Sequence, residues 1–78
     1  MQICIGNLNM MTTARQLAEL FVPFGKVISS RIVSAGPKGR SRGMGLIEMD
    51  YSCGKEAIRR LHLLLFMNYY IEVDEILA

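Results

Sequence analysis

The order of residue patterns along the chain predicts a single α+β domain. Four segments have the composition and alternation of β-strands, and two segments with helical spacing lie between them. The predicted order is strand, helix, strand, strand, helix, strand. The 78 residues, 51% of them apolar, are enough for one small core and no more. We therefore expect residues 1–78 to form one domain.

The first part of the chain predicts a strand followed by a helix. Residues 2–7 (QICIGN) place Ile3 and Ile5 on one side, as in a half-buried strand. Thr13, with Gln16 three residues later, forms the capping box that begins a helix. Three apolar residues then recur at helical spacing and mark its inward face: Leu17, Leu20 and Phe21.

Two strands are predicted in the middle of the chain. Residues 27–33 (VISSRIV) are rich in β-branched residues, which favour strands. A loop at residues 35–39 leads to a third strand at residues 43–49, with Ile47 and Met49 inward. Two glycines on the inner side of this strand leave room for a helix to pack close. The outward residues are Met44, Leu46 and Glu48.

A second helix and a last strand complete the pattern. Asp50 or Ser52 can cap a helix that runs to about residue 62. Residues 69–75 (YYIEVDE) alternate as a strand. Two successive βαβ units indicate a ferredoxin-like βαββαβ fold, with a four-stranded antiparallel sheet and two helices on one face. The other face of the sheet must then meet water or a partner.

Positive charge is concentrated in the middle of the chain. The net charge is only +2, but the segment from residue 26 to residue 42 contains no acidic residue. Its basic residues are Lys26, Arg31, Lys38, Arg40 and Arg42. We expect one part of the surface to be clearly positive.

Several classes of protein are disfavoured. Two cysteines are too few and too far apart for a disulfide framework or a zinc site, and they predict reduced thiols in a cytoplasmic protein. The N-terminus enters a strand at once, without the features of a secretory signal. The apolar run LHLLLFM is too short to span a bilayer, so no membrane partner is expected. His62 has no second ligand or general-base partner nearby, so we expect no catalytic residue, no metal site and no cofactor.

Two short motifs lie on the first and third predicted strands. Residues 3–8 read ICIGNL, and residues 42–49 read RGMGLIEM. They resemble the hexamer and the octamer (K/R-G-F/Y-G/A-F-V-x-F/Y) of the RNA recognition motif, or RRM, family. Residues 17–25 (LAELFVPFG) are similar to the first helix and turn of that family. The resemblance covers essentially the whole chain, and GRSRG followed by GLIEM looks most like the compact, single-domain bacterial members.

The resemblance implies an RNA-binding function with a weakened base-binding surface. In the family, aromatic residues of the two motifs stack on bases. Those positions here are Cys4, Met44 and Leu46, none of them aromatic. Losing two stacks would cost about 2–6 kcal/mol, which the polarisable sulfur of methionine offsets in part. We therefore expect weak binding of single-stranded RNA, or single-stranded DNA, with little sequence selectivity.

The resemblance also suggests the other contacts. Arg42 holds the basic position of the octamer, which contacts phosphate in the family. Phosphate contacts are expected from Arg31, Lys38, Arg40 and Arg42. Asn7 would offer hydrogen bonds at the end of the first strand. Tyr70, expected on the outer face of the last strand beside Cys4, would stack on a base. The alternatives are a solvated basic loop and a tyrosine lying flat on the edge of the sheet.

A protein interface is the alternative to RNA. An apolar sheet face without aromatic residues is also typical of such interfaces, and a loop or the C-terminal tail covering the face is a third interpretation. Three outward acids disfavour phosphate unless Arg31 or Arg42 neutralises them: Glu48, Glu72 and Asp74. Salt distinguishes the alternatives, because phosphate contacts weaken steeply as salt rises.

The apolar run at residues 63–67 (LLLFM) is a second candidate protein interface. It is too apolar for an ordinary surface turn. We expect one or two of these residues to belong to the core: Phe66 alone, or Phe66 with Leu63. The remaining residues, which would be exposed and would support a protein partner or a homodimer, are Leu64, Leu65 and Met67.

Overall fold

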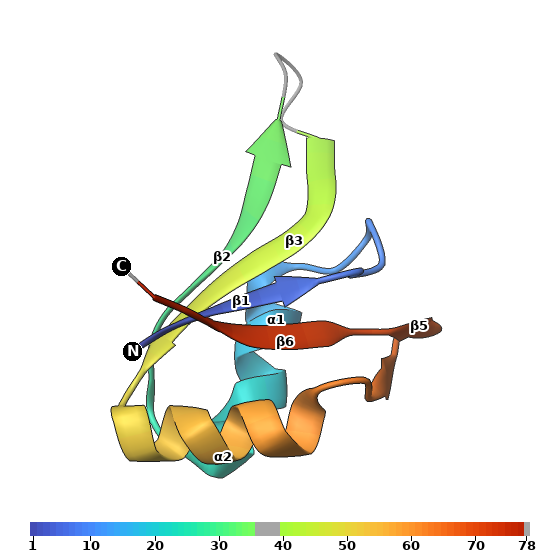
Figure 1. The fold of residues 1–78 in the computed structure, drawn as a ribbon. Coiled ribbons are helices and arrows are strands. Elements are labelled where there is room, and N and C mark those ends of the chain that lie inside the picture. The colour runs from blue at the N-terminus through green and yellow to red at the C-terminus, as the bar shows by residue number, and fades with distance from the viewer. Residues whose placement is uncertain (36–39, 78) are drawn as a thin grey trace.

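The computed structural model describes residues 1–35 and 40–77, with the side chains of residues 35 and 40–42 excepted. A four-stranded antiparallel sheet has the order β2-β3-β1-β6, and two helices pack on one of its faces (Figure 1). The strands and helices of these two layers are β1 (Gln2–Gly6), α1 (Ala14–Phe21), β2 (Val27–Ala35), β3 (Arg40–Met49), α2 (Tyr51–Leu61) and β6 (Glu72–Ile76). The predicted ferredoxin-like fold is confirmed.

Both helices begin at the side-chain caps that the sequence predicts. The Thr13 hydroxyl accepts a hydrogen bond from the Gln16 backbone N–H at 3.1 Å, and the Thr13 backbone N–H donates to the Gln16 side chain at 2.9 Å. Asp50 caps α2 by accepting from the Ser52 N–H at 3.1 Å. Each cap satisfies backbone donors that have no partner within the helix. A short 3₁₀ helix, η1 (Val22–Phe24), follows α1.

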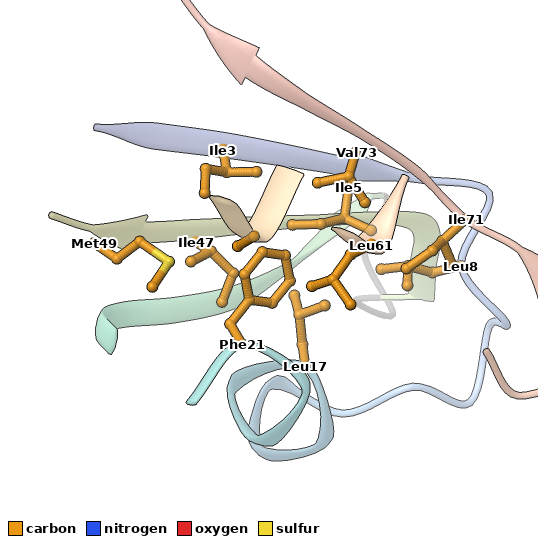
Figure 2. Close-up of a cluster of buried hydrophobic side chains, with 11 residues drawn as sticks. Ile3, Ile5, Leu8, Leu17, Phe21, Ile47, Met49, Leu61, Ile71 and Val73 are labelled. Carbon is orange, nitrogen blue, oxygen red and sulfur yellow. The ribbon is translucent and has the colours of Figure 1, made fainter. Parts of the chain in front are cut away.

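The core lies between the helices and the inner face of the sheet. Figure 2 shows the side chains of this cluster converging from both layers. The buried apolar residues are Ile3, Ile5, Leu8, Leu17, Phe21, Ile47, Met49, Ala57, Leu61, Ile71 and Val73. Gly45 faces the same layer, and a β-carbon there would overlap the Leu17 side chain. The absence of a side chain at Gly45 therefore lets α1 approach β3, as predicted. The prediction is wrong for Gly43, which has a φ of 73° and lies against the Leu8 backbone.

The end of α2 is fastened to the last strand. His62 caps α2, and its imidazole Nδ1 accepts a hydrogen bond from the Val73 backbone N–H at 3.0 Å. This contact gives the single histidine a structural role at the surface. Among the described residues, no helix is long and apolar enough to cross a membrane.

The prediction of one strand over residues 69–75 is wrong in its first half. Tyr69–Tyr70 form a separate strand, β5, which pairs with β4 (Leu65–Phe66) in a small hairpin. The two loop residues between them, Met67 and Asn68, have φ angles of 48° and 73°. Positive φ at both positions is the geometry of the two-residue turns that close hairpins. The chain therefore reverses before Tyr69, and only Glu72–Ile76 joins the main sheet.

The hairpin also settles the position of the leucine run. Phe66 packs against the core, as expected. Leu63 is 58% exposed, so of the two candidates only Phe66 belongs to the core. It lies in the turn after α2 with a positive φ of 65°, and its N–H donates to the Ile71 carbonyl at 2.7 Å. The backbone of Leu63 is thus used to connect the hairpin, while its side chain faces solvent.

Candidate nucleic-acid interface

The face of the sheet opposite the helices presents side chains in rows that cross the strands. One row consists of Ser29, Glu48, Gln2 and Ile76. The adjacent row consists of Arg31, Leu46, Cys4 and Asp74. The third row includes Val33 and Met44. Residues directly opposite each other on neighbouring strands point to the same face, so these side chains share one surface.

Three side chains of this surface form what we call the apolar patch: Cys4, Met44 and Leu46. Cys4 lies directly opposite Leu46. Both are half-buried, and Met44 is 39% exposed, so the described chain does not cover the patch. Burial, and secondarily the nearby charge of Asp74, raises the pKa of the Cys4 thiol. The thiol therefore stays protonated at neutral pH, and the patch is neutral.

Val33 extends the apolar patch, and our sequence analysis did not assign it to the site. It lies directly opposite Met44 and is half-buried. The sequence contained the information needed to place it, because strand alternation puts Val33 on the same side as Arg31. The patch therefore reaches from β1 to the edge strand β2.

Charge is distributed unevenly across the open face. Arg31 on β2 is exposed and lies opposite Leu46, as expected from the sequence. Asp74 and Glu72 lie on β6, at the other edge of the sheet. The neutralising contact that we considered for these acids is not made by Arg31, which has no ion pair among the described side chains. The β2 edge is consequently the side more favourable to phosphate.

The remaining predicted phosphate contacts lie near the connection between β2 and β3, at the end of β2 and the start of β3. Lys38 falls outside the described residues. Arg40 and Arg42 lie on β3, where Arg40 pairs with Ala35, but their side chains are outside the description. The two strands project here beyond β1 and β6 (Figure 1). The backbone thus carries both arginines on a two-stranded extension of the sheet.

Tyr70 does not lie beside Cys4, so the prediction of a substitute stacking ring there is wrong. Asp74 occupies the position opposite Cys4. Tyr70 belongs to the β4–β5 hairpin, opposite Leu65, and is 62% exposed. The Asn7 side-chain amide donates to the Tyr70 carbonyl at 2.9 Å. Asn7 therefore holds the hairpin to the end of β1 while remaining exposed on the surface.

The candidate protein interface lies on the same hairpin. Leu64 and Leu65 are exposed, as expected. Met67 is half-buried: its sulfur accepts a hydrogen bond from the Thr12 hydroxyl at 3.5 Å, and its carbonyl accepts one from the Asn9 amide at 3.0 Å. Met67 thus connects the hairpin to the loop before α1, and little of its side chain is available to a partner. Both tyrosines of β5 add exposed area that our sequence analysis did not include in this surface.

Groups that could bind a metal ion are dispersed among the described residues. Within residues 1–35 and 40–77, no three His, Cys, Asp or Glu side chains gather in a way that could hold a metal ion. Cys4 and Cys53 are both free thiols. What the open face offers is a neutral apolar patch between a basic edge at β2 and an acidic edge at β6.

Comparisons with known proteins show which proteins this chain is similar to. A family model described as RNA recognition motif matches residues 3–72. The chain is 42% identical over 49 residues to the 28 kDa ribonucleoprotein, chloroplastic, of Spinacia oleracea, a match covering 63% of this chain and 21% of the relative. It is equally identical over 49 residues to RNA-binding protein CP31B, chloroplastic, of Arabidopsis thaliana, covering 63% of this chain and 17% of that protein. The chain therefore spans about a fifth of the length of these curated relatives.

Solved structures match over all or nearly all of the chain. The crystal structure of RNA Binding Protein PG1 superposes with a TM-score of 0.95 and 35% identity, covering 100% of this chain and 95% of that one. The RNA15 RRM superposes with a TM-score of 0.87 at 23% identity, covering 95% of this chain and 86% of that one. The second likeness concerns the fold alone.

Proposed function

Because the chain belongs to the RNA recognition motif family, we propose that it binds single-stranded RNA across the open face of its sheet. The observation that carries the proposal is the apolar patch beside Arg31, at the positions of the family's two motifs. Bases must be unpaired to lie flat on such a patch, which favours single strands over duplexes.

The patch and the basic edge have different roles in this proposal. Cys4, Met44 and Leu46 contact the faces of bases by dispersion, and any base offers such a face. Arg31, together with Arg40 and Arg42 on the projecting strands, contacts phosphates, which gives affinity without reading sequence. Without aromatic stacking the binding is weak. The patch has no feature that selects ribose, so single-stranded DNA is bound as well.

The acidic residues on β6 orient the bound RNA strand. Asp74 and Glu72 on β6 repel phosphate, whereas β2 attracts it. The sugar–phosphate backbone therefore follows β2 and β3, and the bases extend over the patch toward β1. This arrangement lets an acidic residue such as Asp74 coexist with RNA binding on the same face.

The proposal is tested by amide NMR of labelled protein with a mixed pool of short single-stranded RNAs at low and moderate salt. Shifts at Cys4, Arg31, Met44 and Leu46 that fade as salt rises are expected. Unchanged signals on this face at high RNA concentration would contradict the proposal.

A second candidate function is association with a protein, including a second copy of this chain, through the β4–β5 hairpin. The observation that favours it is a set of large exposed side chains in one short segment: Leu63, Leu64, Leu65, Tyr69 and Tyr70. Exposed apolar residues gathered in this way are typical of interaction sites. Broad NMR lines that sharpen on dilution, with the largest changes in the hairpin, would support this function. Sharp lines at all concentrations and no mass increase in light scattering would exclude self-association.

A further inference from the structure

A shallow hollow opens on the sheet face beside the apolar patch, toward the end of β3 that is remote from Arg40 and Arg42. It holds about 270 Å³ of space, part of it open to solvent. Its lining residues are Gln2, Ser29, Arg31, Leu46, Ile47 and Glu48. A residue in β3 rises about 3.3 Å, so Glu48 lies about 20 Å along the strand from Arg42. The hollow thus borders the apolar patch at Leu46 and lies apart from the two arginines on the projecting strands.

The walls of the hollow combine complementary hydrogen-bonding groups. The Glu48 carboxylate only accepts hydrogen bonds, and the Arg31 guanidinium only donates them. The Gln2 amide and the Ser29 hydroxyl can do both. Glu48 lies directly opposite Gln2 on one side and Ser29 on the other. Leu46 contributes an apolar wall, so a flat, polar-edged ligand would find both a face contact and edge contacts.

The two charges at the hollow do not neutralise each other. Among the described side chains, neither Arg31 nor Glu48 takes part in an ion pair or a side-chain hydrogen bond. Arg31 and Glu48 lie in neighbouring rows and have opposite charges, yet their side chains form no ion pair across the hollow. Both groups therefore remain available to a ligand that carries donors for the carboxylate and an acceptor for the guanidinium.

We propose that this hollow binds one unpaired guanine base and gives the domain a preference for RNA with guanine at one position; this inference rests on the proposed RNA binding. A carboxylate needs donors, and guanine presents two adjacent ones, N1–H and the N2 amino group. Its O6 lies beside them as an acceptor for Arg31 or Gln2. Glu48 thus becomes a specificity residue rather than a source of repulsion.

The other bases fit the same walls less well. Adenine and cytosine each offer one amino group beside an unprotonated ring nitrogen, which would face a carboxylate oxygen with its lone pair. Uracil has one N–H between two carbonyls, which would likewise point oxygen at oxygen. Two-point base contacts typically discriminate by roughly 5- to 150-fold. For an open hollow we expect the lower end, about 5-fold or more.

The test uses the full chain and five oligoribonucleotides that differ only at one central position within a uridine tract: guanosine, inosine, adenosine, cytidine or uridine. Affinities are measured by fluorescence anisotropy at low salt. The guanosine oligomer is expected to bind about 5-fold or more tightly than the others. Inosine lacks the N2 amino group and is expected to lose most of that advantage.

A matched pair of variants separates the hollow from simple charge. Glu48→Gln keeps the size of the side chain but replaces one acceptor with a donor, and it is expected to abolish the guanosine preference. Glu72→Gln removes the same charge from the same face outside the hollow, and it should leave the ratio of guanosine to inosine affinity unchanged. Equal loss of the ratio in both variants would overturn the proposal.

The remaining outcomes are also decisive. Equal affinity for all five oligomers, or tightest binding of another base, would overturn the guanine site and leave the proposed RNA binding standing. Absence of binding to every oligomer would overturn the proposed function and the guanine site with it. The unmodified chain with the inosine oligomer gives a result even if the Glu48 variant folds poorly.

Discussion

Cys4 lies directly opposite Leu46 in the antiparallel pairing of β1 and β3. The two sequence motifs, far apart along the chain, therefore meet in one neutral patch at the centre of the open face. Neither residue is aromatic, and the raised pKa of the Cys4 thiol keeps it uncharged. The patch can thus support a base but cannot stack on it as a ring would.

Replacing Met44 with phenylalanine should strengthen RNA binding. Met44 is already exposed on the open face, so a ring can be added there without disturbing the core. One base stack is worth roughly 1–3 kcal/mol, and we expect affinity for a short single-stranded RNA to rise accordingly in an anisotropy titration. Leu65→Phe, on the hairpin, is the control and should leave affinity unchanged. If a folded Met44→Phe protein binds no more tightly, bases do not lie on the patch.

Replacing Arg31 with glutamine should weaken binding and reduce its dependence on salt. For single strands, each neutralised phosphate adds about 0.7 to the slope of log affinity against log salt. The slope is therefore expected to decrease by about 0.7 in Arg31→Gln. The slope is the decisive readout, because Arg31 also lines the hollow beside Glu48.

The control for the salt experiment is Arg15→Gln. Arg15 lies on α1 with an exposed side chain, and among the described side chains its one ion pair is with Glu19, at 3.2 Å. Its replacement removes the same charge from the helical side of the domain and should leave the slope unchanged. Equal slopes for the Arg31 variant and the unmodified chain would indicate that Arg31 does not contact phosphate.

Substitution of Gly45 by alanine should destabilise the fold. The added β-carbon would overlap the side chain of Leu17 and crowd that of Leu8. Overpacking of this kind costs about 1–3 kcal/mol of unfolding free energy, measurable by urea denaturation. Gly6→Ala is a matched control on a neighbouring strand, because the atom nearest its added β-carbon is 3.7 Å away. Similar losses in both variants would mean that strand flexibility, rather than contact with α1, determines the effect.

Most elements of the fold were predicted from local sequence patterns. The errors arose where the structure depends on how distant strands pair. The Thr13–Gln16 capping box and the alternation in β1 depend on residues close in sequence, and both were predicted. Residues 69–75 also alternate, yet the turn at Met67 and Asn68 separates Tyr70 from the main sheet. Neither turn residue is glycine, so the reversal left little signal in the sequence.

In the candidate site, too, local patterns were predicted correctly and features that depend on strand register were not. The motif positions Cys4 and Leu46 were predicted to meet, because their strands were identified correctly. The hollow was not predicted, because it depends on how three strands are aligned. A register shift between Val27 and Ser29 places Val27 against the core and Ser29 opposite Glu48. Such a bulge depends on the whole sheet and is hard to infer from alternation alone.

Acid should weaken the fold in part through the cap of α2. The pKa of Asp50 is lowered, mainly by the hydrogen bond from the Ser52 hydroxyl and then by the backbone N–H groups of Cys53 and Ser52. A carboxyl whose pKa is lower in the folded state stabilises the protein above its unfolded pKa. That contribution is lost as the pH falls through the folded value. Unfolding free energy should therefore decline as the pH drops below about 3.9.

The Asp50→Asn variant isolates this contribution. Asparagine is a comparable helix cap but does not titrate, so its unfolding free energy should change less with pH over the acidic range. The measurement is urea denaturation of both proteins between neutral and strongly acidic pH. Glu56, whose pKa is lowered by Arg59 and Arg60, titrates in both proteins and therefore cancels from the comparison. Identical pH profiles would show that the Asp50 cap does not depend on its charge.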